Sequence, residues 1–197
     1  MLVDKADGKE GFCMRGYFGI GVEGITKPAN AGALFRTAHA FGASFFFTIA
    51  TDYTRREGNQ ADTADSSQAV PWYDFPDLDA MQLPRGCTLV GIELTDDAVA
   101  LPAFRHPISA AYVLGRERGA LTPEMLARCA HVVQIPTRFC INVATAGAIV
   151  MYDRAISMGR FAERPLMAGG AAAGPPEHVH GGPVFRTPER IARFRKL

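Results

Sequence analysis

Residues 16–50 read GYFGIGVEGITKPANAGALFRTAHAFGASFFFTIA, and this stretch decides the fold class. Its two apolar runs, Tyr17–Val22 and Ser44–Ala50, have the continuous apolar character of strands that are covered on both faces. Between them, apolar residues recur at helical spacing over about a dozen residues, and Gly42 stands where a C-terminal cap is expected. A strand, a helix and a second strand in this order predict a parallel pair joined by a crossover, which is the unit of an α/β fold.

The rest of the chain repeats this alternation. Three further apolar runs predict strands at Thr88–Leu94, Ala111–Leu114 and Val132–Ile135. A second helix is expected to begin at Thr122-Pro123-Glu124, where an N-cap hydroxyl precedes a proline and an acidic residue. The longest helix is expected over about Asn142–Phe161. We therefore expect an α/β fold with a mostly parallel sheet flanked by helices.

Two segments depart from the alternation. Between residues 51 and 83 the periodicity fails, which predicts a long loop with room for short helices only. Towards the C-terminus, the run Ala168–Pro176 is rich in glycine and alanine and predicts a linker, and Arg186–Leu197 is a basic segment. The expected organisation is one globular domain over residues 1–161, followed by a low-complexity linker and a basic tail over residues 162–197.

The composition is that of an ordinary globular domain of 197 residues, with 48% hydrophobic residues and 21 Lys and Arg against 20 Asp and Glu. The charge is unevenly spread, because residues 1–159 hold 14 Lys and Arg against 17 Asp and Glu, whereas residues 160–197 hold 7 against 3. A body with a net charge of −3 and a tail of +4 indicates that any affinity for nucleic acid depends on a few placed arginines and on the tail.

The sequence argues against several classes of protein. The four cysteines, Cys13, Cys87, Cys129 and Cys140, are scattered, which favours free thiols over a disulfide framework or a metal site. No apolar run reaches the roughly 20 residues of a membrane span, and the first residues lack a signal-peptide pattern. We expect a cytoplasmic protein with no membrane contact and no metal.

The run Gly19-Ile20-Gly21-Val22-Glu23-Gly24 matches the glycine fingerprint of dinucleotide-binding proteins. In that fingerprint the third glycine opens a helix whose free N–H groups meet the pyrophosphate. Here Thr26-Lys27-Pro28 follows instead, so the helix can hardly begin before the proline, and Asp52 lies later than the fingerprint requires. We favour a tight exit from the strand, and an NAD-dependent oxidoreductase remains an alternative.

Three segments combine glycine with charged or amide side chains at the predicted carboxyl ends of strands: Lys27–Ala38, Leu114–Leu121 and Gln134–Ala144. In open α/β sheets this edge is where ligands bind. Few polar groups and several apolar ones are typical of a cofactor pocket, so we expect the three segments to form one site.

These segments resemble the three motifs of the SpoU or TrmH-like branch of the SPOUT RNA methyltransferases, in order and placement, across residues 16–161. The residues that carry the first motif are Asn30, Gly32, Arg36, Phe41 and Gly42. Those that carry the second are Leu114, Gly115, Glu117 and Gly119. Those that carry the third are Ile135, Pro136, Cys140, Ile141, Asn142, Val143 and Ala144.

The resemblance implies a deep trefoil knot in the C-terminal part of the domain, which general rules of chain topology would exclude. It implies S-adenosylmethionine as the cofactor, RNA as the partner, and methylation of a ribose 2′-hydroxyl in tRNA or rRNA. It also implies a homodimer whose long C-terminal helix packs at the interface and whose active site is shared. A non-catalytic RNA-binding relative remains an alternative.

The same resemblance assigns the site residues. Main-chain groups at Ile92, Gly115, Ile135 and Ile141 would hold the cofactor, with Cys140 beside them. Cys140 stands where the family usually has serine, and a thiol is the poorer hydrogen-bond donor, which motivates the non-catalytic alternative.

The catalytic set implied by the resemblance is Arg36, Glu117, Asn142 and Asn30. A guanidinium is effectively always protonated, so we expect Arg36 to grip a phosphate and to stabilise the developing alkoxide rather than to accept its proton. Glu117 would orient Arg36, and Asn142 would position the ribose or the loop around the cofactor. Asn30 is also able to cap its helix.

For RNA recognition the sequence offers arginines and two aromatic side chains. Arg138 would contact a phosphate, and Arg55 and Arg56 add charge in the predicted long loop. Trp72 and Tyr73 would supply faces on which a base stacks, and the alternative for these loop side chains is packing within the loop itself. The basic tail would add further phosphate contacts.

Overall fold

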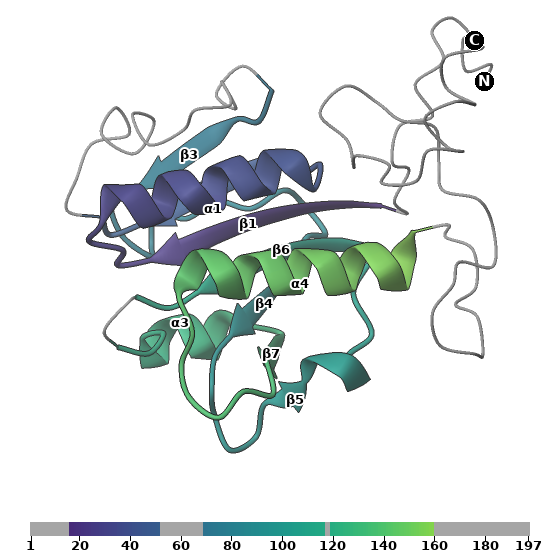
Figure 1. Ribbon diagram of the computed structural model, residues 1–197. Coiled ribbons are helices and arrows are strands. Elements are labelled where there is room, and N and C mark those ends of the chain that lie inside the picture. Colours follow the sequence, from purple (N-terminus) through teal and green to yellow (C-terminus); the bar gives the residue numbers. More distant parts are fainter. Residues whose placement is uncertain (1–15, 52–68, 117–118, 160–197) are drawn as a thin grey trace, which may run out of the picture. The chain divides into compact units, whose positions relative to one another are not determined.

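The computed structural model describes residues 16–51, 69–116 and 119–159, which form a parallel sheet of seven strands in the order β3-β2-β1-β6-β4-β7-β5 (Figure 1). The strands are β1 (Tyr17–Glu23), β2 (Phe45–Ile49), β3 (Trp72–Phe75), β4 (Thr88–Ile92), β5 (Val99–Ala100), β6 (Ser109–Leu114) and β7 (His131–Gln134). The helices are α1 (Pro28–Ala40), the short 3₁₀ helix η2 (Leu101–Ala103), α3 (Pro123–Arg128) and α4 (Val143–Met158). All five predicted strands and all three predicted helices are present, so the α/β class is confirmed.

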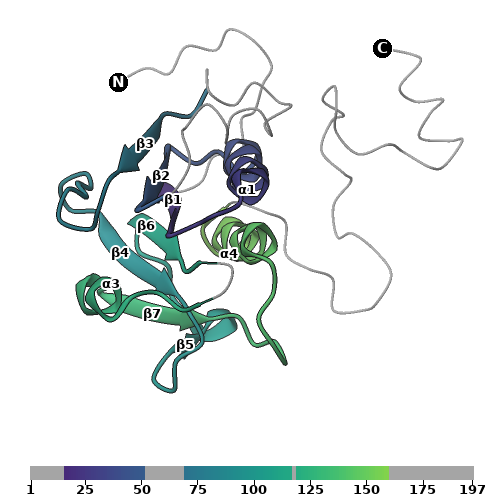
Figure 2. The ribbon, with the colours of Figure 1, turned by 90° about the vertical axis from the view of Figure 1, so that its left-hand side faces the viewer.

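The helices cover the two faces of the sheet unequally. Helices α1 and α4 lie side by side on one face, and α3 lies on the other (Figure 2). The contact between α1 and α4 is close because Gly147 of α4 faces Leu34 of α1, and a Cβ at Gly147 would lie 2.2 Å from the Leu34 Cδ1. This packing brings the first and third sequence motifs together.

The short helix α3 begins as the sequence predicts. The hydroxyl of Thr122, at the N-cap, accepts a hydrogen bond from the Met125 N–H at 3.2 Å, and Glu124 lies in the first turn. Met125 is fully buried and packs against the face of the sheet opposite to α1 and α4.

Strand β3 lies inside the segment that the sequence predicts as a loop, so that prediction was wrong for residues 72–75. The strand is short and lies at the edge of the sheet, and only Trp72 among its four residues is buried, so its apolar pattern is too weak to mark it. The two-residue β5 was missed for the same reason.

Trp72 is 4% exposed, and the prediction that its ring stacks on a nucleotide base was wrong. The indole packs against Phe46 and Phe35, with ring centroids 4.7 and 4.9 Å away, and its N–H donates to the Thr48 hydroxyl at 3.0 Å. A buried indole with a satisfied N–H is a core residue.

The glycines of the apparent dinucleotide fingerprint have a packing role. In the register of β1 and β2, Gly19 lies opposite Phe45 and Gly21 lies opposite Phe47. A Cβ at Gly19 would lie 2.1 Å from the Phe45 ring, and one at Gly21 would lie 2.2 Å from the Phe47 carbonyl oxygen. Strand β2 therefore requires glycine at these two positions of β1, and the third glycine, Gly24, has a φ of +62° where the chain leaves the strand. Packing and the turn account for the fingerprint without a nucleotide, which removes the support for the oxidoreductase alternative.

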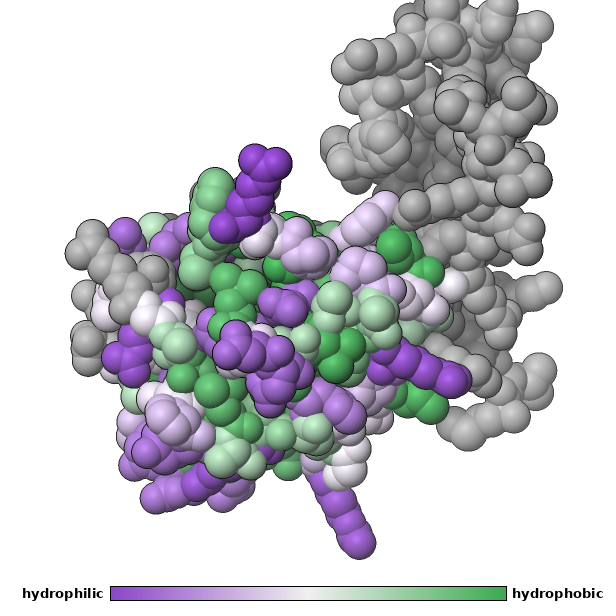
Figure 3. All heavy atoms as spheres, turned by 90° about the horizontal axis from the view of Figure 1, so that it is seen from below, coloured by the Kyte–Doolittle hydropathy of each residue, from purple (hydrophilic) through white to green (hydrophobic). Residues whose placement is uncertain are grey.

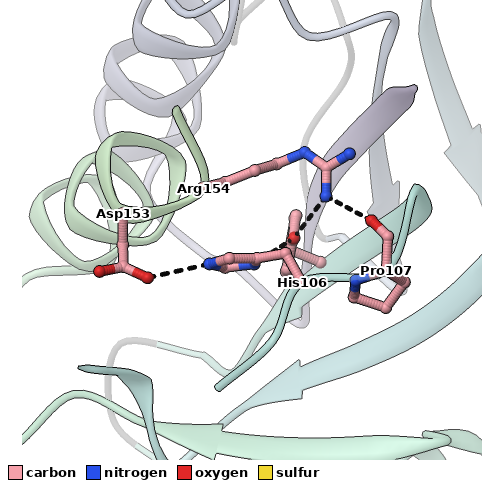
Figure 4. A network of polar contacts seen from close by, with 5 residues as sticks. His106, Pro107, Asp153 and Arg154 are labelled. Carbon is pink, nitrogen blue, oxygen red and sulfur yellow. Dashed lines mark hydrogen bonds and ion pairs between the residues drawn. The ribbon is translucent and has the colours of Figure 1, made fainter. Parts of the chain in front are cut away.

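A buried arginine ties α4 to the amino ends of β1 and β6. Arg154 of α4 is 0% exposed, and its guanidinium donates to the carbonyl oxygens of Ile108 (2.8 Å) and Tyr17 (3.2 Å). It also donates to the carbonyl oxygen of Pro107 at 2.7 Å (Figure 4). The guanidinium also lies 5.3 Å from the ring centroid of Phe18, within the range of a cation–π contact. These contacts fix the helix whose N-terminus borders the candidate site.

Hydrogen bonds continue from Arg154 through Tyr112 and His106 to Asp153, and the donor and acceptor of each bond can be assigned. Arg154 donates to the Tyr112 hydroxyl at 3.0 Å, and burial raises the pKa of Tyr112 to about 12, so the phenol keeps its proton. The phenol therefore donates to Nδ1 of His106 at 2.6 Å, which requires a neutral imidazole, and Nε2–H donates to Asp153 at 2.9 Å. Burial, with a smaller contribution from the Arg154 charge, lowers the pKa of His106 despite the Asp153 carboxylate.

This arrangement predicts a pH-dependent stability. In the unfolded chain His106 titrates near 6.5, but its native pKa is lower, so the unfolded state binds a proton that the native state does not. We expect the free energy of unfolding to fall between pH 7 and pH 5.5, by at most about 1.4 kcal/mol per pH unit from this group. Urea unfolding at a series of pH values measures the slope, and His106→Gln is expected to flatten it. An unchanged slope in that variant would assign the dependence to other groups.

Candidate active site

A pocket of about 690 Å³, including space continuous with solvent, lies at the carboxyl ends of the central strands. Its walls come from the ends of β4, β6 and β7 and from the first turn of α4. These strands are neighbours and parallel, so their carboxyl ends meet at one edge of the sheet. All five residues that were predicted to bind the cofactor line this pocket: Ile92, Gly115, Ile135, Cys140 and Ile141.

The pocket wall is mostly apolar, with one acid and one base among its described residues, Glu93 and Arg116. Gly115 brings the main chain of the β6 loop close to the pocket, since a Cβ there would lie 2.9 Å from both the Leu121 nitrogen and a Glu93 carboxylate oxygen. A larger residue at this position would collide with the main chain of Leu121. Such a site fits a mixed apolar and polar cofactor held by main-chain groups.

Asn30 and Asn142 join the first and third motifs directly. The Asn142 side-chain NH₂ donates to the Asn30 side-chain oxygen at 3.2 Å, across 112 residues of sequence. The Asn142 side-chain oxygen accepts from the Ala144 N–H at 2.9 Å and thereby caps α4. The expectation that Asn30 caps α1 was wrong, because the helix begins at Pro28 and Asn30 lies within its first turn.

Arg36 lies on α1, the helix that packs beside α4, and its side chain is exposed. The structure does not place Arg36 in the wall of the pocket. Its predicted partner Glu117 lies outside the described residues, and so do Arg55, Arg56 and the tail. The roles of these residues stay predictions.

The loop between β7 and α4 presents a cation and an aromatic ring to solvent. Arg138 is exposed and Phe139 is 75% exposed. The Thr137 hydroxyl donates to the Phe139 carbonyl at 2.9 Å, which holds the loop in a tight turn beside the pocket residue Cys140. Seen from below, the surface mixes hydrophilic and hydrophobic groups (Figure 3).

Two carboxylates at this edge were missed by the sequence analysis. Glu23, at the end of β1, is 5% exposed and accepts from the Thr122 N–H at 2.8 Å and from its hydroxyl at 2.6 Å. Glu93 follows β4 and accepts from the N–H groups of Leu94 at 2.9 Å and of Leu121 at 2.8 Å. The sequence does carry one sign of both residues, because each is an acidic residue placed directly at the carboxyl end of an apolar strand.

The thiols differ in exposure and in pKa. Burial raises the pKa of Cys129 to about 11 and also raises that of Cys87, so neither is readily ionised at neutral pH. Cys140, at the pocket, is exposed. Cys13 lies outside the described residues.

Across the described ranges, no group of three or more His, Cys, Asp or Glu side chains is arranged to hold a metal ion. In the same part of the chain, no helix has the length and apolar character that a membrane crossing requires.

The sequence profile of the SpoU rRNA methylase family matches residues 18–152, a range that contains the pocket and all three motifs. The chain belongs to the SpoU rRNA methylase family. The trefoil knot that this family implies stays a prediction.

This SpoU family member is similar to several known proteins at low sequence identity. The mouse tRNA (guanosine(18)-2′-O)-methyltransferase TARBP1 is 26% identical over 137 residues, which is 66% of this chain but 9% of that protein. An AdoMet-bound rRNA methyltransferase from Sinorhizobium meliloti is 22% identical with a TM-score of 0.63, over 71% of this chain and 56% of that one. The TrmH/SpoU tRNA modifying enzyme of A. aeolicus is 18% identical with a TM-score of 0.61, over 73% and 77%. This chain thus spans a small part of the mouse relative and about half of the S. meliloti one.

Proposed function

We propose that this protein is an S-adenosylmethionine-dependent RNA methyltransferase that modifies a ribose 2′-hydroxyl in tRNA or rRNA. The observation that carries the proposal is the pocket, because residues of the second and third motifs line it together in a chain of the SpoU family. The activity named for the mouse relative, methylation of a guanosine 2′-oxygen, supports the ribose as the target.

The pocket suits this cofactor. Ile92, Ile135 and Ile141 offer apolar surface to the adenine and the methionine chain, and the main chain around Gly115 offers N–H and C=O groups. When bound, the cofactor supplies a methyl group on a sulfonium, which needs little further activation. The residues of the protein must therefore bind the cofactor and the RNA, orient them, and exclude water.

As the 2′-oxygen bonds to the methyl carbon, the carbon–sulfur bond of the cofactor would break to leave S-adenosylhomocysteine, and the hydroxyl proton would pass to solvent water. Negative charge therefore develops on the oxygen and needs stabilisation. We assign this to Arg36, whose guanidinium also grips the neighbouring phosphate. The hydrogen-bonded pair of Asn30 and Asn142 positions the ribose next to the pocket. Arg138, with Phe139 beside it, contacts the RNA at the pocket mouth.

We further propose a homodimer in which α4 lies at the interface. Three large apolar side chains support this, because Tyr152 and Ile156 on α4 and the nearby Ile108 are 53%, 38% and 59% exposed. Sedimentation at micromolar concentration tests it, and a monomeric mass contradicts it. The scattered thiols and the absence of a membrane-spanning helix among the described residues are compatible with the cytoplasm, which we propose as the compartment.

Incubation of the protein with labelled S-adenosylmethionine and bulk tRNA or rRNA tests the activity directly. Transfer of label to a nuclease-resistant dinucleotide, the signature of a 2′-O-methyl group, is the expected result. Tight RNA binding without transfer would favour the non-catalytic RNA-binding relative, to which the cysteine at position 140 points. Absence of binding to S-adenosylhomocysteine would contradict both the cofactor and the reaction.

Protection of Cys140 from chemical modification by a bound cofactor analogue can be tested without measuring methyl transfer. In a Cys13→Ser background, a maleimide at pH 7 is expected to modify Cys140 before Cys87 and Cys129, since only Cys140 is exposed and the others have raised pKa values. S-adenosylhomocysteine at ten times its Kd is expected to slow this modification roughly tenfold. Mass spectrometry of the intact protein measures the rate. NAD serves as the control ligand, and equal rates with and without S-adenosylhomocysteine would remove Cys140 from the cofactor site.

A further inference from the structure

The two walls of the pocket are joined by one side chain. Glu93 directly follows β4 and is one of the residues that line the pocket. One of its oxygens accepts from the N–H of its neighbour Leu94 at 2.9 Å, on the β4 wall. The other accepts from the N–H of Leu121 at 2.8 Å, 28 residues later, where the loop from β6 returns to the sheet.

We infer that Glu93 is a positioning residue for the cofactor pocket, which holds the β6 loop at a fixed distance from the end of β4. The inference rests on the proposed function, since it concerns the pocket of that cofactor. The geometry is specific, because a Cβ on Gly115 would lie 2.9 Å from the same Glu93 oxygen that holds Leu121. The carboxylate therefore lies where a side chain at Gly115, the glycine of the second motif, would have to go.

The chemistry requires a carboxylate rather than an amide. Two N–H donors face the side chain, one at each oxygen, and an ionised carboxylate accepts at both positions. Glutamine has one oxygen and one NH₂ group, so one of the two N–H groups would face a donor. Hydrogen bonds to a charged acceptor are also stronger than those to a neutral one.

A second carboxylate holds the same segment from outside the pocket. Glu23 accepts from the N–H and hydroxyl of Thr122, the residue that follows Leu121, but it does not line the pocket. Glu23 therefore anchors the start of α3, whereas Glu93 sets the wall that a bound cofactor touches. This division of roles makes the effect of Glu93 on cofactor affinity separable from its effect on folding.

The test compares three variants of the full chain. Glu93→Gln removes the acceptor at one N–H, and Glu93→Asp keeps the charge but is too short to hold Leu94 and Leu121 together. Asp97→Asn removes one negative charge from the same segment without touching the pocket, since Asp97 accepts from the Thr95 hydroxyl. Calorimetry with S-adenosylhomocysteine is expected to show a Kd raised about tenfold in both Glu93 variants and unchanged in Asp97→Asn.

Amide hydrogen exchange without any cofactor gives an independent readout. In Glu93→Asp, which is too short to reach it, the Leu121 N–H is expected to exchange faster, while the Thr122 N–H, held by Glu23, keeps its protection. In the active enzyme the KM for S-adenosylmethionine is expected to rise with little change in kcat.

The outcomes separate this inference from the proposed function. Wild-type affinity for S-adenosylhomocysteine together with unchanged Leu121 exchange in the Glu93 variants overturns the inference. A wild-type protein that does not bind S-adenosylhomocysteine overturns the proposed function, and the exchange of Leu121 still tests the role of Glu93. If Glu93→Gln does not fold, Glu93→Asp, which retains the charge and the Leu94 contact, decides between these outcomes.

Discussion

Replacing Arg36 by alanine is expected to lower methyl transfer by roughly 100- to 1000-fold, the usual cost of removing a group that stabilises charge in a transition state. The reason is that the attacking 2′-oxygen becomes negative as it loses its proton, and Arg36 is the cation that the family resemblance assigns to it. Because the side chain is exposed and does not line the pocket, affinity for S-adenosylhomocysteine is expected to stay within about twofold of the wild type. Single-turnover transfer to RNA and calorimetry measure the two quantities.

Two control variants sharpen this result. Arg36→Lys keeps the charge but loses the planar fork, so we expect it to recover part of the rate. Arg128→Ala removes a cation of similar exposure from α3, where it pairs with Asp79, and is expected to leave the rate unchanged. Loss of RNA binding in Arg36→Ala with a normal rate at saturating RNA would limit Arg36 to gripping a phosphate.

The sheet was predictable because its central strands are covered on both faces and are therefore continuously apolar. The pattern fails at the edge, where β3 exposes Tyr73 and Asp74 and buries only Trp72. The indole was misassigned for this reason, since sequence alone does not distinguish an exposed aromatic ring in a loop from the one buried residue of an edge strand.

The position of the candidate site was also predictable, because loops at the carboxyl ends of parallel strands must meet. The side chains that shape the site were less so. Glu93 accepts from a main-chain N–H 28 residues away, and main-chain donors carry no sequence signal. Asn142 pairs with Asn30 across 112 residues, which only the packing of α4 on α1 explains.

Replacing Arg154 by methionine is expected to cost about 3 to 5 kcal/mol in the free energy of unfolding. Methionine replaces the aliphatic part of the arginine side chain, but it removes four hydrogen bonds, three of them to the main-chain oxygens of Tyr17, Pro107 and Ile108. Those oxygens lie at the amino ends of β1 and β6, where α4 is anchored. Urea unfolding followed by circular dichroism measures the change at pH 7.

The matched control is Arg128→Met, which removes an arginine from a partly exposed ion pair with Asp79. Exposed pairs contribute about 0 to 1 kcal/mol, so the two variants should differ by several kcal/mol although each loses the same side chain. Equal and small losses would mean that the apolar packing of methionine against Phe18 offsets the lost hydrogen bonds. A large loss confined to Arg154→Met would show that a buried guanidinium bound to neutral oxygens anchors α4, the helix that carries Asn142 at its N-cap.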